Sequence, residues 1–222
     1  MPSCCLGDCS FCITKLAKGN LQSFPKEDII NEIKKRIEEG YKRINLTSTD
    51  NGCYGLDINT SLVSLLKNIT EIPGDFKIRI GMINPNYAKL YLNDLIKIYK
   101  SDKIIKFLHI PVQSGSNKIL KDMNRKYKVQ DFINVVSKFR KNILGINIST
   151  DIIVGYPTES EEDFEETLNL VKKIKPEVLN ISKFTSRPGT KASRLKQLKT
   201  EEIKRRSVIL TNLYKDYLRN KK

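Results

Sequence analysis

Short runs of β-branched residues alternate with longer amphipathic segments along the chain, and this alternation constrains the fold more than any other feature. Runs typical of strands lie at 43–48, 76–82, 107–112, 146–155 and 178–184. Helical periodicity occupies 25–40, 60–70, 88–100, 128–142, 160–174 and about 200–219. Strands and helices that alternate in this way form a parallel sheet with right-handed crossovers. The sequence therefore predicts an α/β fold, either an open βα barrel or a doubly wound sheet.

The organisation of the chain favours a single domain. No Gly-x-Gly-x-x-Gly sequence follows the first expected strand, which disfavours a dinucleotide-binding sheet. Neither an internal repeat nor a low-complexity linker divides the 222 residues. We expect a core over 1–199 and a basic helix over 200–222 that packs on this core or extends from it.

The charge of the chain bears on its partners. Lys and Arg total 40 against 25 Asp and Glu, which gives a formal net charge of +15. This excess favours association with phosphate backbones, although a biased genome composition would produce it too. The basic C-terminal helix either contacts nucleic acid or presents a solvated face. No apolar run approaches the roughly 20 residues of a membrane span, and the first residues lack a signal peptide, so we expect a cytoplasmic protein without membrane contact.

Four of the five cysteines lie in the first dozen residues, and the fifth, Cys53, stands apart. Without a secretory signal, such crowding indicates a metal or a cluster rather than disulfides. Cys5, Cys9 and Cys12 have the spacing Cys-x3-Cys-x2-Cys, whereas Cys4 does not complete it. Three thiolates can hold three irons of a 4Fe–4S cluster and leave the fourth iron open to a small molecule.

A structural zinc site is the competing interpretation. Such a site needs four ligands, commonly in paired Cys-x2-Cys units. Cys53 is a conceivable fourth ligand, but nothing pairs with it, and the only histidine, His109, lies in an expected strand. The spacing alone favours the cluster and leaves zinc open.

With the aromatic Phe11 before its last cysteine, this motif resembles that of the radical S-adenosylmethionine (SAM) superfamily. The resemblance implies a 4Fe–4S cluster held by Cys5, Cys9 and Cys12, with SAM bound to the open iron through its amino and carboxylate groups. It also implies that the reduced cluster cleaves SAM to methionine and a 5′-deoxyadenosyl radical, and that the fold is a partial βα barrel.

Further segments narrow the resemblance. They lie at 12–19, 46–55, 79–85, 108–116, 150–157 and 187–190 and resemble, in the expected order, those of threonylcarbamoyladenosine tRNA methylthiotransferases of the archaeal and eukaryotic branch. The resemblance implies a transferase that inserts a methylthio group at C2 of N6-threonylcarbamoyladenosine in the tRNA anticodon stem-loop. Such an enzyme needs an electron donor and a sulfur donor. A radical enzyme acting on another substrate, or a non-catalytic basic zinc module, are the alternatives.

Functional groups of such barrels lie at the carboxyl ends of the strands. Candidates at these ends are Thr49, Asp50, Asn84, Gln113, Ser114 and Gly155. The resemblance makes Gln113, Asp151 and Gly155 candidates for SAM contacts, although Gly155 equally well shapes a turn. Phe11 is expected either near the adenine of SAM or as a cap on the loop. His109 is either a core residue or a site residue, and no catalytic side chain is assigned.

The chain also departs from complete methylthiotransferases. Those carry an N-terminal domain with three more cysteines, linked to sulfur delivery, and a C-terminal β-rich RNA-binding domain. Because only four residues precede Cys5, we expect the strand that normally leads into the cysteine loop to be missing as well. Either the chain is an excised or split portion of such an enzyme, or it depends on partners such as a separate N-terminal methylthiotransferase domain or chain. We expect it to bind one cluster and SAM, and to leave one sheet edge unpaired.

Overall fold

Five parallel strands form the centre of the molecule in the computed structural model, which describes residues 1–220. In chain order they are β1 (Arg43–Leu46), β2 (Lys77–Ile80), β3 (Phe107–His109), β4 (Asn147–Val154) and β5 (Val178–Lys183). Strand β1 pairs with β2, and β4 pairs with β3 and β5, all in parallel. A parallel bridge between Ile78 and Ile104 joins the two groups of strands. The strands thus follow chain order around a partial barrel, which confirms the expected fold class.

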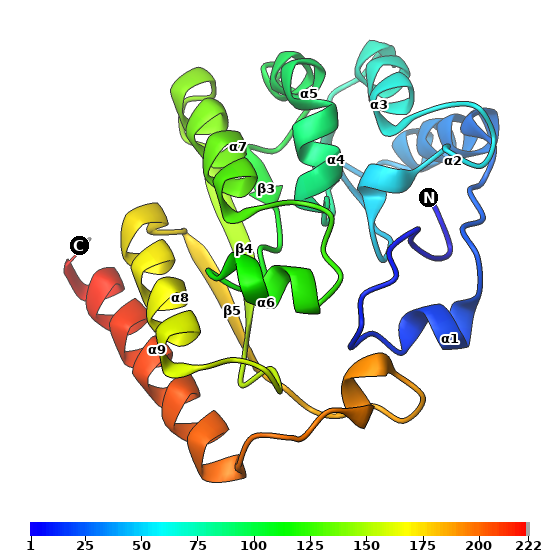
Figure 1. Cartoon of the computed structure of the whole chain (residues 1–222). Coiled ribbons are helices and arrows are strands. Elements are labelled where there is room, and N and C mark those ends of the chain that lie inside the picture. Colours follow the sequence, from blue (N-terminus) through cyan, green and yellow to red (C-terminus); the bar gives the residue numbers. More distant parts are fainter. Residues whose placement is uncertain (221–222) are drawn as a thin grey trace.

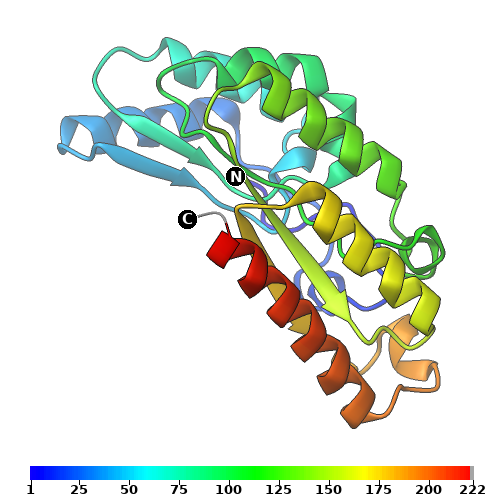
Figure 2. The same ribbon diagram turned by 90° about the vertical axis from the view of Figure 1, so that its left-hand side faces the viewer.

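Helices surround the strands on their outer side (Figure 1). The long ones are α2 (Lys26–Glu38), α3 (Leu62–Glu71), α5 (Leu92–Tyr99), α7 (Val129–Asn142), α8 (Glu161–Ile174) and α9 (Thr200–Asn220). Figure 2 shows the strands twisting through the centre of the molecule. None of the helices described in residues 1–220 is long and apolar enough to cross a membrane.

The pleat of each strand separates an apolar outer face from a polar inner face. In β2, Ile78 and Ile80 are buried, whereas Arg79 between them is only half-buried. In β4, Thr150 and Ile152 lie against residues of α7 and α8. Because successive side chains of a strand point to opposite faces, Asp151 between them faces the inside of the barrel. The apolar core therefore lies between strands and helices, and the concave face is left for polar groups.

Several short helices, α1 (Thr14–Lys18) among them, differ from the sequence-based expectation. The stretch 88–100 is broken at Tyr91, where α4 (Pro85–Leu90) ends and α5 begins. Helix α6 (Asn117–Asp122) was not expected at all. Helices α4 and α6 each have six residues, too few for an apolar period to stand out from the surrounding loops. The remaining connections hold α1 and the 3-10 turns η1 (Asn51–Cys53) and η2 (Lys191–Arg194).

The C-terminal helix α9 packs along β5 and α8, with Leu210 fully buried in the core. It covers the barrel instead of extending away from it, as Figure 1 also shows. The domain boundary at 199/200 stays a prediction, and the last two residues of the expected helix lie outside the described part. At the other end of the sheet, β1 has no strand partner beyond β2 among residues 1–220.

Candidate cluster-binding site

The three cysteines of the motif differ in exposure from the other two. Cys5, Cys9 and Cys12 are partly exposed, whereas Cys4 and Cys53 are completely buried. The thiol of Cys53 donates to the carbonyl of Asp50 at 3.2 Å. The three cysteines of the motif are therefore accessible at the loop surface, whereas Cys4 and Cys53 are not.

Backbone contacts hold this loop against two distant segments. Ser10 donates its amide to the carbonyl of Met123 at 3.1 Å, directly after α6. Its carbonyl accepts from the amide of Ala192 in η2 at 2.8 Å, and its hydroxyl lies 2.8 Å from that of Tyr156. The side chain of Asn124 donates to the carbonyl of Asp8 at 2.7 Å. Hydrogen bonds to three parts of the chain, at 123–124, Tyr156 and Ala192, thus hold the loop in place without any strand pairing.

Arg125 is the contact that sequence reasoning missed. Its guanidinium donates to the sulfur of Cys9 at 3.1 Å and to the carbonyl of Pro111 at 3.1 Å. It also donates to the hydroxyl of Tyr127 at 2.9 Å. The guanidinium therefore places a positive charge within hydrogen-bond distance of one of the three motif sulfurs, where it opposes the negative charge of a cysteine-ligated metal centre. In the sequence, Arg125 follows a helix too short to be expected, so nothing marked it as a site residue.

A cavity of about 210 Å³ opens beside Cys9, and two predicted site residues, Asp50 and Asn84, line it. The Asp50 carboxylate accepts from the amides of Gly52 at 2.9 Å and Asn84 at 3.1 Å. Burial raises the pKa of Asp50 to about 6, against the opposing effect of these two hydrogen bonds. The structure therefore brings Asp50 and Asn84 together with the cysteine loop.

Three predicted residues carry buried polar atoms without a hydrogen-bond partner in the described part of the chain. These atoms are Thr49 Oγ1, Asn84 Oδ1 and Gln113 Oε1. Gln113 also has φ +73°, a conformation that non-glycine residues seldom adopt. Buried polar atoms normally find a partner, and backbone strain of this kind gathers at ligand sites. All three residues follow the carboxyl ends of strands, so a polar ligand there would supply the missing partners.

Asp151 lies on the concave face within a polar triad. Its carboxylate lies 3.0 Å from His109 Nε2 and accepts from the side-chain amide of Asn180 at 2.7 Å. Burial alone would raise the pKa of Asp151, but these hydrogen bonds hold it below its ordinary value. The structure gives His109 a carboxylate partner on the open face of the sheet, and neither residue lines the cavity beside Cys9.

Phe11 and Ser114 also lie apart from that cavity. Phe11 packs against the small apolar cluster that contains Met123 and Tyr156. Ser114 is fully buried, and its hydroxyl accepts from the amide of Ser116 at 3.1 Å. Both positions as SAM contacts stay predictions.

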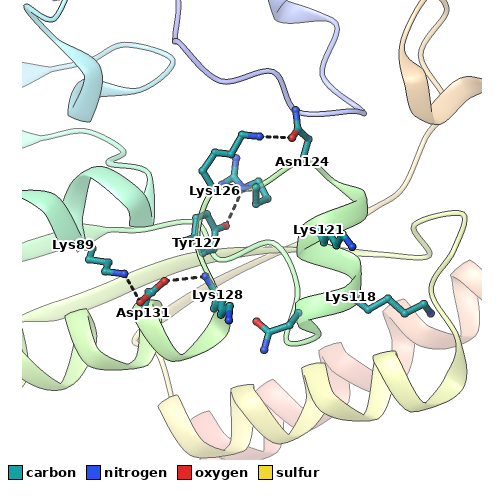
Figure 3. A pocket seen from close by; sticks show the side chains of 10 residues that line it. Lys89, Lys118, Lys121, Asn124, Lys126, Tyr127, Lys128 and Asp131 are labelled. Carbon is teal, nitrogen blue, oxygen red and sulfur yellow. Dashed lines mark hydrogen bonds and ion pairs between the residues drawn. The ribbon is translucent and has the colours of Figure 1, made fainter.

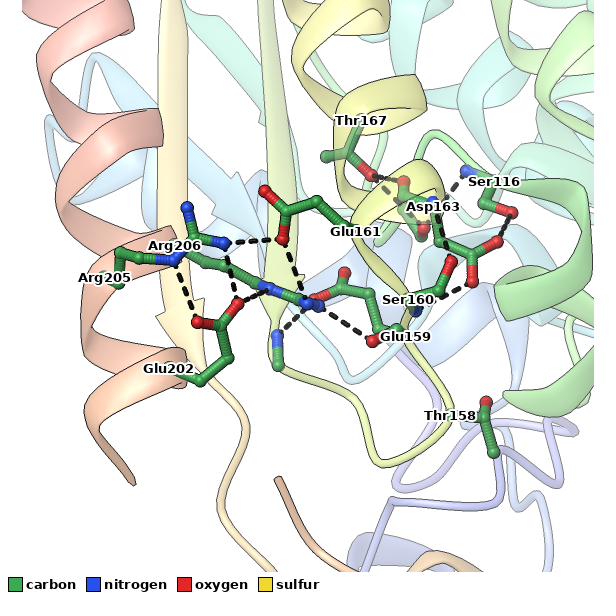
Figure 4. Close-up of polar contacts among 12 residues, drawn as sticks. Ser116, Thr158, Glu159, Ser160, Glu161, Asp163, Thr167, Glu202, Arg205 and Arg206 are labelled. Atoms are coloured by element: carbon green, nitrogen blue, oxygen red, sulfur yellow. Dashed lines mark hydrogen bonds and ion pairs between the residues drawn. The ribbon is translucent and has the colours of Figure 1, made fainter. Parts of the chain in front are cut away.

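Gly155 directly follows β4 and has φ +80°. The buried ion pair between Glu159 and Arg206, drawn in Figure 4, lies beside it. The amide of Gly155 donates to the carboxylate of Glu159 at 2.7 Å, and that carboxylate accepts from Arg206 of α9 at 2.8 Å. A Cβ atom at position 155 would lie 2.6 Å from Ile203. The turn and the close approach of α9 are sufficient to explain why residue 155 is a glycine. A contact of Gly155 with SAM stays a prediction.

Comparison with known proteins identifies the family. The sequence profile of the radical SAM superfamily matches residues 1–171. The chain belongs to the radical SAM superfamily. Solved structures agree on the fold: a cobalamin- and 4Fe–4S-containing radical SAM methyltransferase from Kitasatospora setae superposes with a TM-score of 0.71 over 86% of this chain and 37% of its own, at 15% identity. The radical SAM enzyme coproporphyrinogen III oxidase from Escherichia coli reaches 0.65 over 95% and 51%, at 17% identity.

Three curated relatives carry the name threonylcarbamoyladenosine tRNA methylthiotransferase. Probable threonylcarbamoyladenosine tRNA methylthiotransferases from Pyrococcus horikoshii and Methanocaldococcus jannaschii are 48% and 44% identical over 93% and 100% of this chain. A threonylcarbamoyladenosine tRNA methylthiotransferase from Drosophila melanogaster is 42% identical over 96%. The matched regions cover 48%, 53% and 39% of these relatives. This radical SAM chain thus spans about half the length of the curated relatives it matches.

The cofactors of radical SAM enzymes are a 4Fe–4S cluster and SAM, and the residues of the site fit both. A Cβ atom at Gly7 would lie 3.6 Å from the sulfur of Cys5 and 3.7 Å from that of Cys9, so the two thiols flank one glycine. Cys12 follows on a turn closed by its amide and the Cys9 carbonyl at 3.1 Å. The unpartnered side-chain oxygens near the strand ends suit the amino group and hydroxyls of SAM.

The same geometry does not suit zinc. No three His, Cys, Asp or Glu side chains within residues 1–220 gather closely enough to hold a single metal ion. A zinc ion takes four ligands at about 2.0–2.3 Å, whereas a cubane cluster takes each thiolate on a different iron. Cys53, the conceivable fourth ligand, is turned toward the backbone of Asp50.

Proposed function

We propose that this chain is the radical-generating core of a cytoplasmic tRNA methylthiotransferase, which modifies C2 of N6-threonylcarbamoyladenosine next to the anticodon. The observation that carries the proposal is the loop with three partly exposed cysteines beside a cavity lined by Cys9, Asp50 and Asn84. The relatives named for this activity support the substrate. The net charge of +15 supports an RNA partner independently of the relatives.

The chain's own residues have distinct tasks in this proposal. Cys5, Cys9 and Cys12 hold the cluster, which supplies reductive cleavage of SAM when bound. Arg125 donates to the sulfur of Cys9 and thereby compensates part of the negative charge of a cysteine-ligated cluster. Asn84 lines the cavity, and its buried side-chain oxygen has no hydrogen-bond partner among residues 1–220, which supports a ligand amino group as its donor.

Sulfur transfer needs more than this chain presents. After assignment of three cysteines to the cluster, the remaining Cys4 and Cys53 are both completely buried, so neither offers an accessible thiol. We infer that separate molecules donate the electron and the sulfur to this chain. A separate N-terminal methylthiotransferase domain or chain would supply the second half of the reaction.

Neighbouring cysteines provide a matched test of the cluster. We expect anaerobic reconstitution to give a brown protein with about four irons that cleaves SAM on reduction. Cys5→Ala should lose the iron and reduce SAM cleavage to background, because it removes one of three ligands. Cys4→Ala should keep both, because that side chain is buried away from the loop surface. Iron analysis and chromatography of 5′-deoxyadenosine provide the measurements. A colourless wild-type protein with one bound zinc would refute the proposal.

The substrate is tested separately. Mass spectrometry of tRNA from a strain lacking this gene should show N6-threonylcarbamoyladenosine without the methylthio group. Persistence of the methylthiolated nucleoside would exclude this substrate and leave a radical SAM enzyme acting on another one. Return of the modification with wild-type protein, and not with Cys5→Ala, would connect the substrate to the cluster.

A further inference from the structure

A large basic groove adjoins the cavity beside the cluster-binding loop (Figure 3). The groove has a volume of about 1020 Å³ and is lined by side chains from α4, α6, the 124–128 loop and the start of α7. Its cationic residues are Lys89, Lys118, Lys121, Arg125, Lys126 and Lys128, and its one acidic residue is Asp131. We call this surface the basic groove.

Three of these six cations are lysines that no carboxylate neutralises among residues 1–220. Asp131 is occupied by Lys89, 2.8 Å from its carboxylate, and Lys118 pairs with Asp163. Lys121, Lys126 and Lys128 form no ion pair in residues 1–220, where all three side chains are described. Uncompensated ammonium groups around a concave surface attract a polyanion, because binding releases the counterions of that polyanion.

The other basic element of the molecule is different in this respect. On α9, Arg205 and Arg206 are tied to Glu161 and Glu202, and Arg206 also to Glu159 (Figure 4). These two arginines hold the helix to the barrel and are neutralised there. Unlike them, Lys121, Lys126 and Lys128 of the basic groove have no carboxylate partner among residues 1–220.

The basic groove is continuous with the cluster site. Asn124, Arg125 and Lys126 line both the groove and the smaller cavity, and Arg125 donates to the sulfur of Cys9 at 3.1 Å. An elongated anion in the groove would therefore pass directly beside the cavity where SAM chemistry takes place. A polymer with phosphates along its backbone and a base projecting from it fits this arrangement better than a compact acidic ligand.

We infer that the basic groove binds the phosphate backbone of the RNA substrate and directs its target base toward the cavity beside Cys9. The inference rests on the proposed function and adds the path of the RNA to it. Lys121 and Lys128 act there as positioning residues that contact phosphate and take no part in SAM cleavage, because neither lines the cavity.

The test removes two charges from the groove and two from elsewhere. The double variant Lys121→Gln/Lys128→Gln is compared with Lys138→Gln/Lys141→Gln, which has the same charge change on exposed residues near the other end of α7. Both are titrated as the reconstituted full chain against a fluorescein-labelled anticodon stem-loop RNA at several salt concentrations. Each lost phosphate contact lowers the slope of log K against log salt by about 0.7. We expect the groove variant to bind roughly 10-fold or more weakly at 0.1 M salt with a slope lower by about 1.4, and the control to match wild type.

Further measurements separate the outcomes. SAM cleavage without RNA and the thermal midpoint should be the same in both variants, which excludes misfolding. Equal RNA affinity of the groove and control variants would overturn the inference while leaving the proposed function intact. Wild-type protein that fails to bind the RNA at low salt would overturn both. Unchanged RNA binding with slower cluster reduction by an acidic electron-transfer protein would assign the groove to a protein partner and overturn the inference.

Discussion

At the scale of single residues, glycine at position 155 combines two separate constraints. Its φ is +80°, and a Cβ atom would meet Ile203 at 2.6 Å. Gly145 has a similar φ of +70° with nothing within 4 Å of its Cβ position, so it isolates the backbone effect. We expect Gly145→Ala to lower the free energy of unfolding by about 1 kcal/mol and Gly155→Ala by about 2–4 kcal/mol, because the second also overpacks the contact with α9. Urea titration measures both free energies of unfolding. Equal losses in the two variants would show that Ile203 can move aside without destabilising the protein.

Residues also differ in how far the sequence reveals them. The spacing of Cys5, Cys9 and Cys12 predicts a cluster because the ligands lie within one loop. Arg125 could not be predicted, since its contact with Cys9 spans 116 positions and depends on how α6 docks. Asp50 and Asn84 were found from strand ends alone, because parallel strands bring their carboxyl ends to one edge.

At the scale of elements, one buried ion pair joins α9 to the turn that follows β4. The side chain of Arg206 is 5% exposed and that of Glu159 is 0% exposed, whereas the adjacent Arg205 is 45% exposed. We expect Arg206→Ala to cost about 3–5 kcal/mol of unfolding free energy, since it leaves a buried carboxylate without its cation. Arg205→Ala should cost about 1 kcal/mol or less. Chemical denaturation of the two variants provides the measurement, and similar losses would contradict a special role for the buried pair.

The pH dependence of the Arg206→Ala variant checks the same cause. Burial already raises the pKa of Glu159, and removal of Arg206 takes away the charge that opposes this shift. The folded variant then holds a proton on Glu159 more tightly than the unfolded chain does. Its stability should rise relative to wild type as the pH falls from neutral toward 5. A deficit that is constant over this range would point to lost packing instead of an unpaired carboxylate.

Long elements were predictable, and short ones were not. The apolar spacing of α7 and α8 persists over 14 residues each, so both follow from the sequence. The break at Tyr91 and the six-residue α6 depend on tertiary contacts instead, such as the hydroxyl of Ser116 at the start of α6, which donates to the carboxylate of Asp163 at 2.7 Å. These short elements carry the walls of the basic groove, which is why the groove could not be predicted.

At the scale of the whole molecule, the cysteine loop connects parts of the barrel that are far apart in sequence. Ser10 alone contacts Met123 after α6 and Ala192 in η2, and Asp8 contacts Asn124. Figure 1 shows the N-terminal loop beside α6 and beside the segment that precedes α9. The order of strands followed from their alternation with helices, but this closure by a loop did not, because no local pattern encodes it.

The cluster should therefore stabilise remote segments as well as the loop itself. A metal centre that binds only the folded loop shifts local opening toward the closed state by mass action. We expect removal of the cluster by an anaerobic chelator to speed amide exchange at Ser10, Cys12 and Ala192 by roughly tenfold or more, which corresponds to about 1.4 kcal/mol. The amides of β4 should exchange at unchanged rates, because we expect this strand to open independently of the loop. Hydrogen–deuterium exchange of peptides covering 1–24, 187–195 and 147–154 would measure this.

Two other outcomes would contradict the prediction. A uniform acceleration of exchange in all three peptides would mean that the cluster stabilises only global folding. An unchanged exchange rate near Ala192 would show that the contacts of Ser10 do not connect the loop to η2.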